Sequence, residues 1–261
     1  LVPDMSEQNC KSCGQPVTGN FCVECGEKTS NKRLTLKDVF ADFMSNLLEL
    51  EFPLLNTVKG LTLRPGVLCR EYINGKRKPY SRPFQYYLVT LAIFYLFFLA
   101  LGLQISDFSA GIVPEFPEGE AGAPARELAG QINQLINQYS RLFHFVLIPI
   151  TSLFSWVIFK KVGYNFTENF VMNLFLGGHV MLISMVCIPL WFVNFNLYFA
   201  VSGIVGVSYQ VWGYKDFFQV KTSTAVGKGL LAWFLGMIVF SILNLLVTFT
   251  VIRIFNTNDA I

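Results

Sequence analysis

Four cysteines near the start of the chain have the spacing of a metal site. Cys10, Cys13, Cys22 and Cys25 form two Cys-x-x-Cys pairs, each followed by glycine, with eight residues between the pairs. Each pair is typical of a tight turn that directs two thiolates to one point, and the glycine allows a close backbone approach. Two such turns complete a tetrahedral shell of four sulfurs, the geometry that structural Zn²⁺ prefers. We therefore predict a structural zinc ribbon with no open position for catalysis.

Two other states of these cysteines are weighed against zinc. A pair of disulfides is disfavoured because we expect the ribbon in the cytosol, where thiols stay reduced. Iron in the same four-sulfur shell is the main competitor. A segment this small cannot bury a core of its own, so metal binding is expected to supply its folding free energy.

The elements that must carry this ribbon belong in a membrane. The chain is 53% apolar and only 14% charged, whereas soluble proteins carry ~25% charged residues. Several charge-free runs reach the ~18 to 20 residues needed to cross ~30 Å of hydrocarbon. The predicted fold class is an all-α polytopic membrane protein with about five transmembrane helices, a small N-terminal zinc ribbon and amphipathic interfacial helices. The predicted spans are 84–103, 142–159, 170–191, 196–212 and 230–252, with an outer loop at 104–140.

The division between the third and fourth predicted spans has an alternative. Two asparagines and several aromatic side chains at 191–196 suit a membrane interface. A single broken span over 169–212 is the alternative.

The predicted domains follow these spans. Residues 1–8 are expected to be a disordered start, in which 1–4 are a leftover of expression, and 9–33 form the zinc ribbon and a hinge. Residues 34–83 hold the cytosolic amphipathic and interfacial helices with a basic segment, and 84–261 form the transmembrane domain. Thr35 is predicted to cap the first amphipathic helix, with Asp38 three residues further on.

Two apolar segments before the first span are too short or too charged to cross the bilayer. We expect 34–50 and 54–63 to lie in the interface plane or against the inner ends of the spans. The competing arrangement is a re-entrant hairpin with Pro53 at its tip. It is disfavoured because the acids of 34–51 would then enter the bilayer.

The basic residues predict the orientation. With a cytosolic N-terminus, 17 of the 20 Lys and Arg residues fall in inside segments, which is the positive-inside pattern. No signal peptide is seen at the start. We expect a multi-pass inner-membrane protein with the C-terminus outside.

A histidine lies near the middle of the third predicted span. An ionisable group at that depth is a functional candidate, and Asn173 and Gln210 are the polar side chains available to join His179 in an intramembrane site. The favoured interpretation is a neutral imidazole that hydrogen-bonds between helices, with glycines beside it that allow close packing.

A basic cluster, Lys76, Arg77, Lys78 and Arg82, directly precedes the first span. One interpretation is topological, because positive flanks orient a helix. The other is binding of anionic lipid headgroups, worth ~1 kcal/mol per basic residue near the surface. The sequence supports both equally.

The arrangement of motifs resembles a family of uncharacterised bacterial membrane proteins, common in Bacteroidetes, that carry an N-terminal zinc ribbon and a domain of unknown function. The resemblance rests on the cysteine pairs, Arg64-Pro65-Gly66 and Tyr72-x-x-Gly75-Lys76-Arg77-x-x-Tyr80-x-x-Pro83. The layout is also loosely similar to Yip-family membrane proteins. The resemblance implies only that the four cysteines are the zinc ligands.

Two functions are considered. The first is a non-enzymatic membrane protein whose ribbon docks a partner protein or organises a complex, and the alternative is a lipid or small-solute transporter or channel with a site in the bundle. The sequence has no nucleotide loop and no plausible nucleophile–base pair, so we expect no enzyme, and a net charge of +3 does not suggest nucleic acid. Small residues at Ser202 and Gly206 would allow close packing within the chain or in a homo-oligomer.

Overall fold

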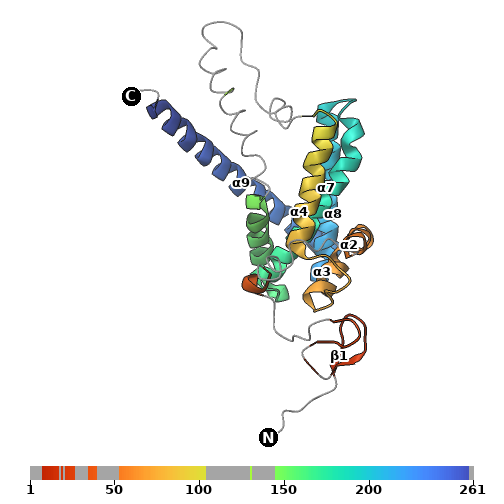
Figure 1. Cartoon of the computed structure of the whole chain (residues 1–261). Helices are drawn as coiled ribbons and strands as arrows, with labels where there is room; N and C mark the ends of the chain where they lie inside the picture. Colours follow the sequence, from red (N-terminus) through yellow and green to blue (C-terminus); the bar gives the residue numbers. More distant parts are fainter. Residues whose placement is uncertain are drawn as a thin grey trace, which may run out of the picture.

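The chain folds into a mostly helical molecule with a small cysteine-rich module at one end (Figure 1). This computed structural model describes residues 8–17, 19, 21–26, 35–39, 53–103, 130 and 145–258. In chain order the described elements begin with the strands β1 (Gln8–Asn9) and β2 (Pro16–Val17), which pair antiparallel. The helices that follow are α2 (Pro53–Leu63), α3 (Pro65–Ile73), α4 (Pro83–Ala100), Phe145–Ile158, α7 (Phe166–Cys187), α8 (Phe195–Phe218) and α9 (Thr222–Asn258).

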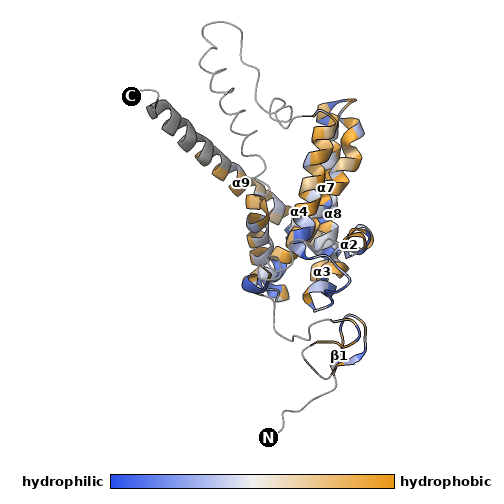
Figure 2. Cartoon of the chain, in the orientation of Figure 1, coloured by the Kyte–Doolittle hydropathy of each residue, from blue (hydrophilic) through white to orange (hydrophobic). Residues whose placement is uncertain are grey.

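Three helices of the described part are long and apolar enough to cross a membrane. They are Pro83–Ala100, Phe166–Leu190 and Thr222–Leu243, and apolar residues line them in Figure 2. The helix Phe145–Ile158 is apolar but shorter. The structure thus supports a membrane protein with three candidate spans, fewer than the five that the sequence predicts. Most of the expected outer loop, 104–140, lies outside the described residues.

Prolines and asparagines set where the helices begin. Proline occupies the first helical position of α3 and α4, where its missing N–H costs nothing. Asn165 and Glu168 form a capping box at the start of α7. After the 3₁₀ turn Ile188–Leu190 the chain reverses, and Asn194 Oδ1 accepts a hydrogen bond of 3.1 Å from the Leu197 N–H to start α8. Residues 166–218 therefore form two separate helices, which pack against each other.

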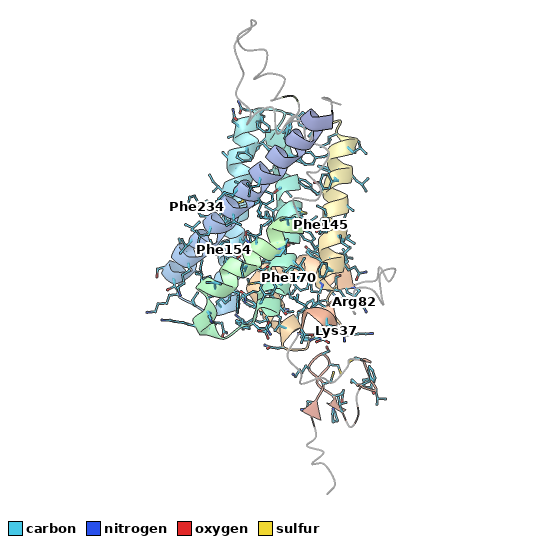
Figure 3. The ribbon with its side chains drawn as sticks, turned by 90° about the vertical axis from the view of Figure 1, so that its left-hand side faces the viewer. Lys37, Arg82, Phe145, Phe154, Phe170 and Phe234 are labelled. Carbon is cyan, nitrogen blue, oxygen red and sulfur yellow. The ribbon has the colours of Figure 1, made fainter. Side chains whose placement is uncertain are left out.

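Most of the lysines and arginines lie at one end of the bundle, which we call the basic end. It consists of the segments 53–83, 160–168 and 213–228, which together hold twelve basic and three acidic residues. Arg82 and Lys37 lie toward this end in Figure 3. The α9 helix starts here and diverges from the bundle (Figure 1).

The short helices α2 and α3 pack against α7 and α8 at the basic end. Leu61, Leu68 and Tyr72 are buried, and the Tyr72 ring meets Phe175 of α7 edge-on at 5.2 Å between centroids. Val39 joins the same core, and Thr35 and Asp38 exchange the predicted capping hydrogen bonds at the start of its helical turn. The rest of the amphipathic helix expected over 34–50 lies outside the described residues.

A glycine permits α3 to cross α8 with the backbones in contact. A Cβ atom added to Gly66 would lie 2.3 Å from the Phe217 backbone N and 2.5 Å from the Gly213 carbonyl O. Both neighbours are backbone atoms of a helix, so neither can move aside without shifting α8. The small residue that the sequence singles out on α8, Gly206, meets Val180 of α7 within the same chain.

The first prediction concerns this crossing. Gly66→Ala should lower the free energy of unfolding by about 1 to 3 kcal/mol, because overpacking against backbone cannot relax through side-chain rotation. The measurement is the thermal unfolding midpoint of the purified protein in mild detergent. Gly203→Ala, on α8 with no atom within 4 Å of the added Cβ, is the matched control. Equal midpoints for the two variants would contradict the close crossing.

Candidate functional site

The four N-terminal cysteines converge in the structure. Their Sγ atoms all lie within 4.8 Å of one another, and the Cys10–Cys25 and Cys13–Cys22 pairs are each 3.5 Å apart. A zinc ion with Zn–S bonds of ~2.3 Å needs sulfurs ~3.8 Å apart at the corners of a tetrahedron. The cysteines are free thiols rather than disulfides. The cluster therefore fits a single metal ion held by sulfur alone.

The local backbone explains how each pair forms its turn. The N–H of Gly14 donates to the Cys10 carbonyl O, and the N–H of Gly26 donates to the Cys22 carbonyl O, each at 2.8 Å. Both glycines have positive φ, +81° and +68°, and nothing lies within 4 Å of an added Cβ. Glycine is thus required for its left-handed backbone, and the close approach expected from the sequence is not the reason.

The environment of Cys10 favours the thiolate, which is the form that binds metal. Hydrogen bonds, the largest from the backbone N–H of Cys13 and others from Ser12 and Cys25, outweigh burial and lower the pKa of the Cys10 thiol to about 6. With four protein ligands a bound Zn²⁺ would have no open position, so the site would hold the ribbon together and would not activate water.

The ribbon presents two apolar side chains to solvent. Phe21 is 59% exposed and Val23, inside the second cysteine pair, is 94% exposed, whereas Cys10 and Cys22 are buried. At Lys11 the ribbon approaches the helical part of the chain, since the Lys11 side chain lies 3.0 Å from an added Cβ on Gly75. Gly75 belongs to the turn between α3 and α4.

His179 is buried between three helices. The Tyr86 hydroxyl of α4 lies 2.8 Å from Nδ1, and the Thr62 hydroxyl of α2 lies 3.2 Å from Nε2. The Thr62 hydroxyl donates to the Val58 carbonyl O, so it accepts from the imidazole, and Nε2 carries the proton. Tyr86 then donates to Nδ1. This pattern is that of a neutral imidazole with both nitrogens satisfied.

Asn173 and Gln210 belong to a different network. Gln210 Nε2 donates to Asn173 Oδ1 at 3.3 Å, and the Tyr214 hydroxyl donates to the same oxygen at 2.8 Å. Asn173 Nδ2 donates to Ser155 on the helix Phe145–Ile158 at 3.1 Å. The structure therefore brings two of the three predicted intramembrane residues together and places His179 in a separate network.

The basic cluster before α4 is partly occupied by contacts within the chain. Lys76 Nζ lies 3.1 Å from Glu71 Oε2, and Arg77 donates to the Tyr72 carbonyl O and stacks over the Tyr72 ring. Lys78 also has interactions within the protein. Arg82 precedes α4 at its N-cap position without a side-chain capping bond.

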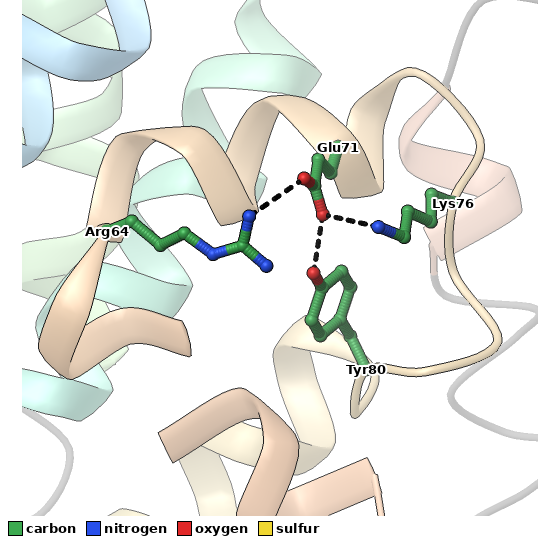
Figure 4. A network of polar contacts seen from close by, with 4 residues as sticks. All are labelled: Arg64, Glu71, Lys76 and Tyr80. Carbon is green, nitrogen blue, oxygen red and sulfur yellow. Dashed lines mark hydrogen bonds and ion pairs between the residues drawn. The ribbon is translucent and has the colours of Figure 1, made fainter. Parts of the chain in front are cut away.

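Glu71 is the centre of this region and is absent from the sequence-predicted site. Figure 4 shows its carboxylate between three donors: Arg64 at 3.2 Å from Oε1, and Lys76 and the Tyr80 hydroxyl at Oε2. Burial alone would raise the pKa of Glu71, but these hydrogen bonds and positive charges outweigh it and hold the pKa below its usual value. Burial, together with Glu71, raises the pKa of Tyr80 to about 12. Arg64 and Glu71 are seven residues apart, about two helical turns, so a shared helix face was the available signal.

The second prediction concerns the metal. Purified protein should contain one zinc per chain, with sulfur as the only neighbour at ~2.3 Å in X-ray absorption. Cys10→Ser should reduce the metal content sharply because a hydroxyl is a poor replacement for a thiolate. Cys69→Ser, which removes a thiol outside the cluster, should leave it unchanged. A disulfide between any two of the four cysteines in the native protein would refute the site.

The third prediction concerns Glu71. Its folded pKa is depressed, so its ionised form stabilises the fold above the unfolded pKa, and this contribution is lost as the pH falls through the folded pKa. Glu71→Gln should lower the free energy of unfolding by about 1 to 3 kcal/mol at pH 7. The difference from wild type should shrink as unfolding midpoints are measured at pH values from 7 down to 3. A difference independent of pH would contradict the assignment.

Comparison with known proteins gives one partial relation. No curated protein and no solved structure matches the chain. Residues 53–95 match a family described as a protein of unknown function (DUF3667). The match spans α2, α3, the turn that holds the Glu71 network and most of α4, and it includes the Arg64-Pro65-Gly66 motif. Residues 53–95 of this chain thus form a DUF3667 domain.

Proposed function

We propose that this chain is a multi-pass protein of the bacterial inner membrane that presents a zinc-stabilised ribbon to the cytosol as a docking site for a partner protein. The observation that carries the proposal is the exposure of Phe21 and Val23 on the ribbon. In its described part, the ribbon buries only a small cluster of Cys10, Val17 and Cys22. Exposed apolar side chains on such a metal-held support are suited to binding another protein.

The placement of the ribbon supports this role. Lys11 contacts the turn at Gly75, in the DUF3667 domain, so the ribbon is held close to the basic end. The excess of basic residues at that end is typical of the cytosolic side. A cytosolic location would also keep the cysteines reduced and available to Zn²⁺.

We further propose five membrane crossings. α8 has 24 residues, enough to span ~30 Å at ~1.5 Å per residue. Residues 142–144, which we assign to the second span, adjoin the described helix Phe145–Ile158. With five crossings, the C-terminus would lie outside. We also propose that the chain is related to the Bacteroidetes-type membrane proteins that its motifs resemble.

The polar groups in the bundle favour docking over transport. A transport site would need polar side chains free to meet a solute, but His179, Asn173 and Gln210 all have hydrogen-bond partners from other helices. These bonds suit a structural role in helix packing. We assign the chain no catalytic role.

The fourth prediction tests docking. Chemical cross-linking in membranes, followed by affinity purification, should recover a partner protein with the wild type and lose it with a Phe21→Ser and Val23→Ser double variant. The zinc content of that variant should stay at one per chain, because neither residue is a ligand. Glu24→Gln, an exposed neighbour within the same cysteine pair, should keep the partner.

The double serine variant removes the exposed apolar surface of the ribbon, whereas Cys10→Ser removes its metal-dependent fold, so the two variants distinguish these contributions. Cys10→Ser should lose both the metal and the partner. If the partner survives the double serine variant, or if no partner is recovered with the wild type, the docking proposal fails.

A further inference from the structure

Arg70 has a buried nitrogen that lacks a partner. It lies on α3, and its Nη1 atom is shielded from solvent with no hydrogen-bond acceptor among the described residues. A buried charged donor without an acceptor is strongly unfavourable, so buried guanidinium groups are normally paired. Something other than the described part of this chain is therefore expected to supply an acceptor.

The acids nearby are committed elsewhere. Glu71, the next residue in the chain, already forms ion pairs with Arg64 and Lys76 and accepts a hydrogen bond from the Tyr80 hydroxyl. Glu168 accepts from the Asn165 N–H in the capping box of α7. Arg70 is close enough to Tyr164, in the turn before α7, for its charge to lower the pKa of that phenol, although burial of Tyr164 raises it more.

The charge of the surrounding surface indicates the sign of the missing group. The basic end contains twelve basic residues and only three acidic ones. Lys161 and Lys221 are exposed there and would attract an anion toward Arg70. In the basic cluster before α4, for which lipid binding is one of the two interpretations of the sequence, Lys76, Arg77 and Lys78 already have contacts within the chain.

We propose that Arg70 binds the phosphate of an anionic phospholipid headgroup at the junction of α3 with the turn before α7. Guanidinium presents its donors in a planar fork that matches phosphate oxygens. α3 packs against α7 and, at Gly66, against the last turns of α8. Arg70 lies near Tyr164, just before α7 begins the candidate span Phe166–Leu190, so Arg70 lies where headgroups would meet the protein. The bound lipid would fix α3 to the membrane surface.

The fifth prediction tests this site by thermal unfolding of delipidated full-length protein in a neutral detergent. Without lipid, Arg70→Met should raise the midpoint relative to wild type, because it replaces a guanidinium whose buried Nη1 atom has no acceptor with an apolar side chain of similar length. Added phosphatidylglycerol should raise the wild-type midpoint by roughly 3 to 6 °C and that of Arg70→Met by much less. Phosphatidylcholine should act weakly on both.

Control variants isolate Arg70 from general charge effects. Lys161→Met removes an exposed cation at the same end and should keep nearly the full response to phosphatidylglycerol. Arg70→Lys keeps the charge without the fork and should respond only in part. Inorganic phosphate at millimolar concentration should have no Arg70-dependent effect; if it reproduces the shift, the anion site stands and its ligand is a soluble phosphate.

Two results would overturn the proposal. Equal responses of wild type and Arg70→Met to phosphatidylglycerol would show that the lipid acts elsewhere. A lower midpoint for Arg70→Met in the absence of lipid would show that an acid of this chain already pairs with Arg70.

Discussion

The backbone contact between α3 and α8 is the constraint on which the rest of the molecule depends. At Gly66 the two helices approach so closely that no side chain fits between them. This crossing fixes α3, and with it the turn that carries Glu71, Lys76 and Tyr80. α4 begins at the end of that turn, and the ribbon approaches the same turn at Gly75. The contact within the basic end thus sets the position of the first candidate span and of the four-cysteine cluster together.

Polar side chains hold the helices together inside the bundle. One network joins α2, α4 and α7 through His179, and another joins the helix Phe145–Ile158, α7 and α8 through Asn173. Between apolar helices in lipid there is little hydrophobic force, so hydrogen bonds and close contacts at small residues must provide specificity. These residues are better explained as structural links than as a path for a solute.

The parts of the structure that were predictable from sequence are those with local causes. The cysteine spacing predicts the converging thiols, because each pair forms its turn within five residues. Thr35 and Asp38 cap a helical turn for the same local reason. The glycine after each pair was expected from its residue type, but the reason is its positive φ and not crowding.

Contacts between distant residues were not predictable in the same way. His179 and Asn173 lie six residues apart on α7 and so face different neighbours, which the sequence alone does not reveal. Lys76 and Tyr80, five and nine residues after Glu71, reach its carboxylate only because the turn folds back. The number of spans also depends on tertiary context. Composition determines the hydropathy of α8 and of Phe145–Ile158, but packing determines how deep in the membrane each helix lies.

The central claim is that a metal-bound ribbon lies on the cytosolic side of a membrane domain. It is tested most directly by labelling with a membrane-impermeant maleimide in a variant in which Cys69 and Cys187 are replaced by alanine, leaving the four ribbon thiols. The account predicts labelling in inside-out membrane vesicles only after the metal is removed with a chelator, and no labelling in right-side-out vesicles. Labelling of right-side-out vesicles, or full labelling of inside-out vesicles before chelation, would contradict it.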